Sequence, residues 1–329
     1  MVFILVALAL VFDFLNGFHD SSNVVATPIS SGAIPPRRAL TMAAVAHFIG
    51  PFLFGVAVAT TIGDGLLDEE AITTSAVIAG LVGAIAWNIF TWYVGLPSSS
   101  SHALIGGLVG AALVESGIQA IQLEGLTRIV VALLLSPILG LAFGYAVMAV
   151  TLFFSRNATP KVNNFFRRIQ YGTLIGLALS HGANDAQKTM GVITLGLVTA
   201  GVLDTFVVPM WVVFLCSTSI ALGTALGGWR LIRTLGGKII RIRPIHAFSS
   251  QVAGGAVIMG AAIAGGPVST TQVMSTSIVG VGAAERANKV RWTVLRDLLV
   301  AWLLTIPAAG LVAAATMGLF LILPDLLPG

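Results

Sequence analysis

Apolar runs of about 20 residues or more recur from one end of the chain to the other. A run of this length crosses the hydrocarbon core of a bilayer as an α-helix, whereas a spanning β-strand needs only about 10 alternating residues. Only 9% of the residues are charged, far fewer than the roughly 25% of a soluble domain. The sequence therefore predicts an all-α integral membrane protein in the lipid bilayer. The net charge of +4 bears on its topology and not on nucleic-acid binding.

The apolar segments form two sets of five on either side of a basic stretch. The segments are expected at residues 1–31, 39–62, 71–95, 102–121 and 128–154, and then at 173–199, 206–229, 247–265, 272–284 and 292–323. Residues 156–170 separate the sets and contain Arg156, Lys161, Arg167 and Arg168. We therefore expect a first repeat at 1–155, a linker at 156–170 and a second repeat at 171–329.

The basic side chains predict the orientation of the chain in the membrane. They gather in residues 37–38, 156–168, 230–243 and 286–291. Cytoplasmic loops carry an excess of Lys and Arg, so the linker is expected in the cytoplasm and both termini outside it. An odd number of crossings in each half then predicts two repeats of opposite orientation, as in many secondary transporters.

Two matching stretches place an aspartate inside an apolar segment. Residues 17–23 and 182–188 share the order Gly, any, polar, Asp, any, any, polar at an offset of 165 residues. A charge at the centre of a membrane helix costs about 2.5–3.5 kcal/mol on insertion scales, and such residues are functional by default. We expect each stretch to break its helix. The alternative to a functional role is a structural one, in which Asp20 and Asp185 cap the broken helices or Asp185 pairs with Lys188.

A second pair of stretches combines proline with hydroxyl side chains. Residues 95–102 and 265–272 match at an offset of 170 residues and contain Pro97 and Pro267. Proline followed by Ser or Thr predicts a helix break and a new helix whose first turn binds anions. Irregular backbone at mid-membrane depth is tolerated only where it lines a cavity. Two such hairpins related by inversion predict a cage for a small tetrahedral oxyanion, although the hydroxyl runs also fit close helix packing. The arms are long enough for full crossings as well as for hairpins that re-enter the membrane to mid-depth.

These paired motifs resemble those of the PiT family of inorganic phosphate transporters over nearly the whole chain. Residues 182–185 match the family's signature tetrapeptide, 17–23 its first-half counterpart and 267–271 its hairpin sequence. The resemblance implies a cation-coupled phosphate symporter of the cell membrane, commonly a homodimer and without a cofactor. By position it assigns phosphate contacts to Ser99, Ser100, Ser101, Ser269, Thr270 and Thr271, and coupling-ion contacts to Asp20, Asn23, Asn184 and Asp185.

The chain departs from the sodium-coupled members of that family at two positions. Lys188 stands where they tend to have Asn, and His47 where they have Glu. An ammonium cannot ligate sodium and repels it from Asp185. We therefore expect proton coupling, with phosphate carried alone or with a divalent metal, and sodium coupling as the alternative. The titratable candidates are Asp20, Asp185, His19 and His47, although His47 fits a packing role equally well.

Other functions remain open from the residues alone. Sulfate is tetrahedral like phosphate, but it carries no proton near neutral pH and so cannot donate to an aspartate. A membrane enzyme lacks support, because the sequence shows no metal-binding spacing of the H-E-x-x-H type and no nucleophile beside a base. A channel is also conceivable, but inverted repeats with buried charges favour a carrier that alternates between two gates.

Overall fold

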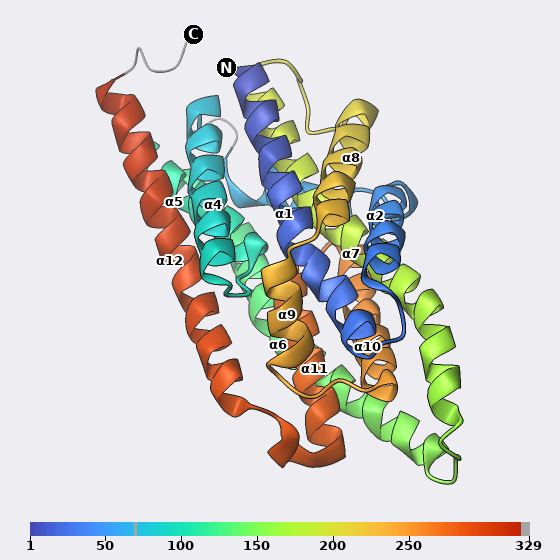
Figure 1. Ribbon diagram of the computed structural model, residues 1–329. Helices are drawn as coiled ribbons and strands as arrows, with labels where there is room; N and C mark the ends of the chain where they lie inside the picture. Colours follow the sequence, from blue (N-terminus) through green and yellow to red (C-terminus); the bar gives the residue numbers. More distant parts are fainter. Residues whose placement is uncertain (69–70, 324–329) are drawn as a thin grey trace.

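The computed structural model describes residues 1–68 and 71–323, and over these residues the chain is a bundle of helices (Figure 1). The first half contains α1 (Val2–Ser30), α2 (Pro36–Leu53), α3 (Ala57–Leu66), α4 (Thr74–Val94), α5 (Ser100–Glu115), the short 3-10 helix η1 (Ile118–Ala120) and α6 (Leu123–Ser155). The second half contains α7 (Val162–Thr199), α8 (Met210–Leu226), α9 (Trp229–Gly237), α10 (Pro244–Ile263), α11 (Thr270–Arg286), η2 (Ala287–Lys289) and α12 (Trp292–Ile322).

Five of the described helices, α1, α4, α6, α10 and α12, are long and apolar enough to cross a membrane. Two further pairs, α2 with α3 and α8 with α9, pass the same test together and are each bent by 70°. The prediction of an all-α, multi-pass membrane protein is therefore confirmed. The bends were not predicted, since residues 39–62 and 206–229 were each expected to form one segment.

The order of elements in the first half recurs in the second. Each half runs through a long helix, a pair bent by 70°, a helix, a hairpin turn with a shorter helix, and a last long helix. Residues 156–161 connect the halves, and residues 162–170 form the first turns of α7. In Figure 1, α1 begins and α12 ends at the upper end of the molecule, opposite this connection.

Both aspartate stretches lie inside continuous helices, so the predicted break at each of them is wrong. Residues 17–23 are part of α1, and residues 182–188 are part of α7. The glycines of these stretches do not break the helix but allow a neighbouring helix to pack closely. A Cβ on Gly17 would lie 2.2 Å from the carbonyl oxygen of Ile220. The backbone keeps its helical hydrogen bonds, and the polar side chains find partners on neighbouring helices.

The polar stretches of α1 and α7 lie between two apolar clusters of the core. In α1, Leu5, Ala9 and Phe12 belong to one cluster and Val24, Val25 and Ala26 to the other. In α7 the order is reversed, with Leu174, Leu177 and Ala178 in the second cluster and Ala186, Met190 and Ile193 in the first. The two aspartate stretches therefore meet in a layer halfway along the bundle.

Two hairpins meet in this middle layer. In Figure 1, α4 and α5 extend from it toward the upper end, and α10 and α11 toward the lower end. The tips touch, because the Ser101 hydroxyl donates to the carbonyl oxygen of Val268 at 3.2 Å. The 16 residues of α5 span about 24 Å at 1.5 Å per residue, which is less than the ~30 Å hydrocarbon core.

The two halves interlock, because the last helix of each packs against the hairpin of the other. A Cβ on Gly106 of α5 would lie 2.4 Å from the carbonyl oxygen of Ile306 in α12. A Cβ on Gly144 of α6 would lie 2.4 Å from the carbonyl oxygen of Ser277 in α11. The site between the hairpins therefore depends on contacts between both halves.

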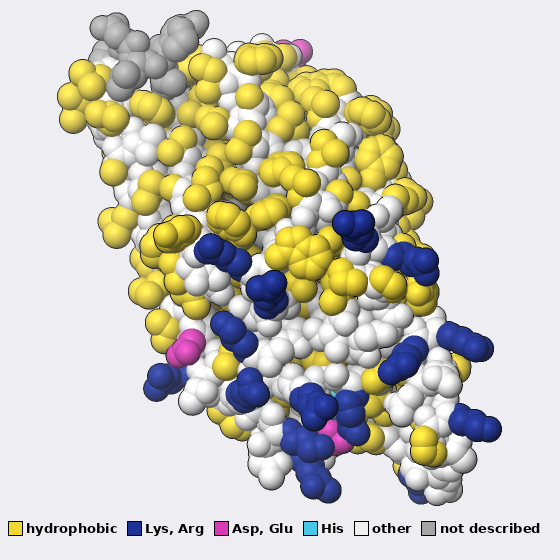
Figure 2. All heavy atoms as spheres, viewed as in Figure 1, with side chains coloured by type: hydrophobic (Ala, Val, Ile, Leu, Met, Phe, Trp, Pro, Cys, Tyr) yellow, Lys and Arg dark blue, Asp and Glu magenta, His cyan; other side chains and the backbone are white. Residues whose placement is uncertain are grey.

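Basic side chains mark one end of the molecule. On the face shown in Figure 2, Lys and Arg lie from the middle of the molecule to its lower end, and apolar side chains dominate the upper part. The lower end is also where residues 156–161 join α6 to α7 (Figure 1).

Substituting Gly182 with alanine is expected to destabilise the protein. A Cβ there would lie 2.7 Å from the Cα atom of His47 and 2.8 Å from its carbonyl oxygen, so α2 and α7 would have to separate. Overpacking of this kind costs about 1–3 kcal/mol. The measurement is the thermal unfolding midpoint of the purified protein. Gly176→Ala, on the same helix with no atom within 4 Å of the added Cβ, is the control; equal midpoints for the two variants would contradict the argument.

Candidate functional site

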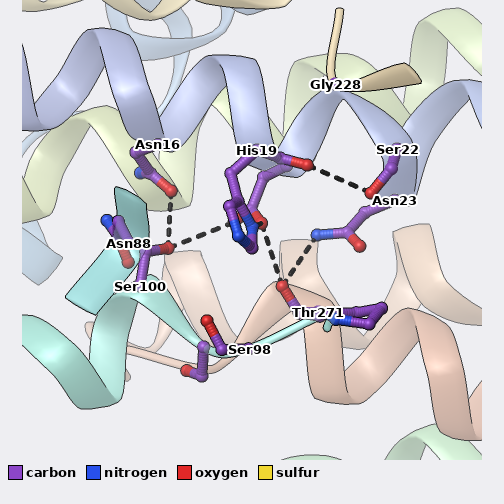
Figure 3. Close-up of polar contacts among 12 residues, drawn as sticks. Asn16, His19, Ser22, Asn23, Asn88, Ser98, Ser100, Gly228 and Thr271 are labelled. Carbon is purple, nitrogen blue, oxygen red and sulfur yellow. Dashed lines mark hydrogen bonds and ion pairs between the residues drawn. The ribbon is translucent and has the colours of Figure 1, made fainter. Parts of the chain in front are cut away.

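Asp20 is the acceptor at the centre of the middle layer. Its buried carboxylate accepts a hydrogen bond from the Thr271 hydroxyl at 2.9 Å, and the hydroxyls of Thr270 and Ser100 lie within reach of it at 3.2 Å and 3.3 Å. The donors come from the first turns of α5 and α11, so one α1 side chain connects both hairpins. Figure 3 shows α1 lying along these helix starts, with Ser100 and Thr271 directed toward it.

Asp185 and Lys188 form a buried ion pair on α7. The Lys188 ammonium lies 2.5 Å from one carboxylate oxygen of Asp185. It also donates to the Ser101 hydroxyl at 2.7 Å and to the carbonyl oxygen of Val268 at 2.9 Å. The ammonium therefore binds one group from each hairpin in addition to Asp185.

Thr270 lies between the two carboxylates. Its hydroxyl is 3.2 Å from an oxygen of Asp20 and 3.2 Å from an oxygen of Asp185. A hydroxyl carries one proton, so it donates to one carboxylate at a time. The two carboxylates thus share a donor, and their mutual repulsion is relieved when a proton or a cation binds between them.

The predicted new helices at both hydroxyl runs are confirmed. Ser99 caps α5 by accepting from the backbone N–H of His102 at 3.2 Å, and Ser269 caps α11 by accepting from that of Gln272 at 3.3 Å. These two hydroxyls are therefore engaged with the helix backbone. The next two hydroxyls of each run point to the carboxylates, the ammonium or the facing hairpin.

The two asparagines of the aspartate stretches bind the second hairpin. The Asn23 amide donates to the Thr271 hydroxyl at 3.0 Å, and the Asn184 amide donates to the carbonyl oxygen of Gly266 at 3.2 Å. The amide oxygen of each is buried and has no hydrogen-bond partner among the described residues. Buried acceptors without a partner are costly, so both oxygens are available to water, an ion or substrate.

His181 belongs to the site and was not predicted. Its Nδ1 lies 3.2 Å from a carboxylate oxygen of Asp185. Its ring stacks on that of His47 with 5.0 Å between centroids, and His47 Nδ1 lies 2.7 Å from the Thr224 hydroxyl. His181 therefore contacts both His47 and Asp185. The spacing of four residues between His181 and Asp185 places both on one helix face and was the available signal.

Two further residues of α1 were also missed. Asn16 accepts from the Ser100 hydroxyl at 2.6 Å, and Asp13 accepts from the Thr189 hydroxyl of α7 at 2.9 Å. Both side chains are buried. The spacings of three and four residues from Asp13 to Asn16 and on to Asp20 place them on one helical face. The structure brings Asp13 beside α7.

The central cluster has the donors for a cation. Ligand atoms of Asp20, His181 and Asp185 lie within 4.8 Å of one another. Carboxylate oxygens suit hard cations, and an imidazole suits a proton or a transition metal. The Lys188 ammonium already lies against Asp185, which removes one oxygen from the set that a small cation needs.

This cluster defines the class of protein. Two carboxylates, an ammonium and paired helix starts lie buried halfway along a multi-pass helical bundle, which is the position of a substrate site in a membrane transporter. The chain belongs to the phosphate transporter family, whose model matches residues 16–313.

Relatives with similar sequences bear the same description. The chain is 43% identical to a "Probable low-affinity inorganic phosphate transporter" of Bacillus subtilis over 319 residues, covering 95% of each chain. It is 44% identical to the protein of that description from Rhizobium meliloti over 312 residues, covering 94% of this chain and 93% of the relative. The resemblance to the phosphate transporters is therefore confirmed, and the chain is a phosphate transporter.

A solved structure shares the fold. The chain described as "The sodium-dependent phosphate transporter" superposes with a TM-score of 0.88 over 98% of this chain and 99% of that one, at 23% sequence identity.

Proposed function

We propose that this transporter imports inorganic phosphate by symport with protons. Phosphate is held between the starts of α5 and α11, and the carboxylates of Asp20 and Asp185 carry the coupling charge. The observation that carries the proposal is the set of hydroxyls around Asp20, because phosphate needs the same donors.

Competition for these hydroxyls links the proton to the anion. A charged Asp20 holds the hydroxyls of Ser100, Thr270 and Thr271 and repels phosphate. A protonated Asp20 carries no charge and releases hydroxyls to the substrate. Proton binding and phosphate binding then favour each other by the same factor, as linkage requires.

Lys188 serves as a permanent cation beside Asp185. Its ammonium contacts three oxygens, and two of them belong to facing hairpins. A tethered charge of this kind keeps the cage attractive to an anion without a bound sodium ion. Ser101, Thr270 and the capped first turns of α5 and α11 supply the uncharged donors.

Sodium coupling is the alternative, and it is favoured by the name of the structurally similar protein, which is sodium-dependent. Co-transport of a neutral metal phosphate with a proton is a second variant of the proposal. It is supported by the carboxylates and imidazole of Asp20, Asp185 and His181. Both alternatives use the same site and differ in the ion that crosses with phosphate.

We further propose that the two halves are inverted repeats in the cell membrane and that the protein forms a homodimer. The inversion is supported by the repeated order of elements and by the opposite directions of α1 and α7 in Figure 1. The excess of Lys and Arg at the end with residues 156–161 favours a cytoplasmic linker and termini outside. The homodimer is carried over from the family.

Liposomes that hold the purified protein test the coupling ion. An inward gradient of about one pH unit is expected to raise the accumulation of labelled phosphate by about tenfold, because one proton per phosphate adds ~1.4 kcal/mol of driving force. An inward sodium gradient at equal pH is expected to change uptake less than twofold. Uptake that follows sodium and ignores pH would contradict proton coupling. Counterflow of labelled phosphate without any gradient is the control for a working carrier, which a pore cannot reproduce.

Competition in the same liposomes tests the substrate. Unlabelled phosphate is expected to suppress counterflow at a concentration about tenfold lower than sulfate, because only phosphate donates a hydrogen bond to a carboxylate near neutral pH. Equal suppression by the two anions would favour a sulfate permease of the same family.

A further inference from the structure

A basic cavity lies at the lower end of the bundle, away from the transport site. It has a volume of about 500 Å³ and is lined by Ile240, Arg241, Arg243, His246, Gly282, Glu285, Lys289 and Arg291. Glu285 and Thr270 are separated by 15 residues of α11, or about 22 Å along the helix axis. The cavity is therefore distinct from the cage at the start of α11.

The lining of the cavity carries a surplus of positive charge. It holds four Lys and Arg side chains and one carboxylate. Glu285 is shared by three partners: it is ion-paired with Arg243, lies 3.0 Å from His246 Nε2 and 3.2 Å from the Lys289 ammonium. In Figure 2, basic side chains crowd the lower end around an acidic one.

Two arginines of this lining have no carboxylate partner in the part of the chain that the structure describes. Within the described residues, neither Arg241 nor Arg291 lies in an ion pair, and the Arg291 guanidinium donates to the carbonyl oxygen of Gly237 at 3.4 Å. Guanidinium groups bind phosphate through paired N–H donors and keep their charge at all physiological pH values. The guanidinium groups of Arg241 and Arg291 are thus suited to bind an anion with several oxygens.

We propose that this basic cavity is a second anion site, which binds a phosphate-bearing anion larger than a single phosphate. Arg241 and Arg291 are its main donors, and its volume lies in the range of ordinary small-molecule pockets. Glu285 is the built-in counter-ion: it holds Arg243 and Lys289 in place and competes with the incoming anion for them. The same chemistry is offered by a soluble diphosphate and by the headgroup of an anionic phospholipid.

The cavity lies between the outer ends of α10 and α11, the two arms of the second hairpin. Arg243 is the N-cap residue of α10, and Glu285 lies in the last turn of α11. The contacts of Glu285 with Arg243 and His246 tie the beginning of one arm to the end of the other. The site therefore lies where a bound anion contacts both arms of the hairpin that carries Ser269–Thr271 at its tip.

Calorimetric titration of the purified protein in neutral-lipid nanodiscs with pyrophosphate tests the proposal. The double variant Arg241→Gln, Arg291→Gln is expected to bind pyrophosphate at least about tenfold more weakly, because two charge-assisted contacts are lost. Glu285→Gln is expected to bind it about threefold more tightly, because a competing carboxylate is removed. Arg38→Gln, an exposed arginine at the start of α2 outside the cavity, is the control and should match the wild type.

The weaker pyrophosphate binding expected of the double variant and the tighter binding expected of Glu285→Gln distinguish a binding site from a structural cluster. An unchanged affinity in the double variant, or weaker binding in Glu285→Gln, would overturn the proposal. Nanodiscs with phosphatidylglycerol distinguish the sources: loss of the pyrophosphate signal there assigns the site to a lipid headgroup, and persistence assigns it to a soluble anion. Counterflow of labelled phosphate in the double variant measures the function of the transport site separately. A failure of the second anion site is therefore distinguishable from a failure of the proposed symport.

Discussion

Replacing Lys188 with asparagine is expected to reduce sodium-independent phosphate uptake at least about 100-fold and to make the remaining uptake respond to sodium. The ammonium lies 2.5 Å from Asp185 and contacts both hairpins. Removing one partner of a buried pair leaves a buried charge uncompensated, at a cost of about 3–5 kcal/mol. The amide oxygen of asparagine restores a ligand for sodium, which then takes the place of the ammonium.

Uptake into liposomes with and without sodium is the measurement. Lys161→Asn, which removes an exposed lysine near the connection of the halves, controls for the loss of one positive charge. The double variant Asp185→Asn, Lys188→Asn removes both charges and is expected to recover the thermal stability but not the transport. Uptake by Lys188→Asn that is lost at every sodium concentration would show that the lysine only neutralises Asp185.

The second large effect is expected at Asp20. Asp20→Asn should lower net uptake driven by a pH gradient at least about 100-fold, because an amide cannot carry a proton across the membrane. Counterflow of labelled phosphate requires no net proton movement. It should therefore remain within about tenfold of the wild type, because the amide oxygen still accepts from the hydroxyls near residue 20.

The comparison of net uptake with counterflow separates coupling from structure. Asp297→Asn, at an exposed aspartate in the first turns of α12, is the matched control and should leave both rates unchanged. Equal losses of net uptake and counterflow in Asp20→Asn would mean that the carboxylate only organises the hydroxyls. Unchanged net uptake would exclude Asp20 as the proton carrier.

Local patterns predicted the hairpins and the middle of the site. Proline followed by hydroxyls is a strong signal for a new helix, and Ser99 and Ser269 are the caps that this signal implies. An aspartate in an apolar run is an equally clear reason to propose a function. Neither pattern tells whether the aspartate helix breaks, because that depends on which neighbours accept and donate hydrogen bonds.

The packing of the helices decided that question. Ser100, Thr270 and Thr271 come from other parts of the chain and satisfy Asp20, so α1 has no need to unwind. His181 joins the site for a similar reason, since its role follows from its distance to Asp185 and from stacking on His47. A single sequence with many apolar helices does not specify which faces meet.

The sequence by itself determined that this protein is an all-α membrane protein with two pairs of repeated motifs, because apolar length, buried charge and helix caps are local properties. Those motifs also carry its resemblance to the phosphate transporters. Only the tertiary structure decided that both aspartate helices run unbroken and that each hairpin packs against the last helix of the other half. It also decided that the Lys188 ammonium connects the two hairpin tips. These features depend on contacts between residues far apart in the chain, where close packing at glycines and shared hydroxyl donors determine which side chains meet.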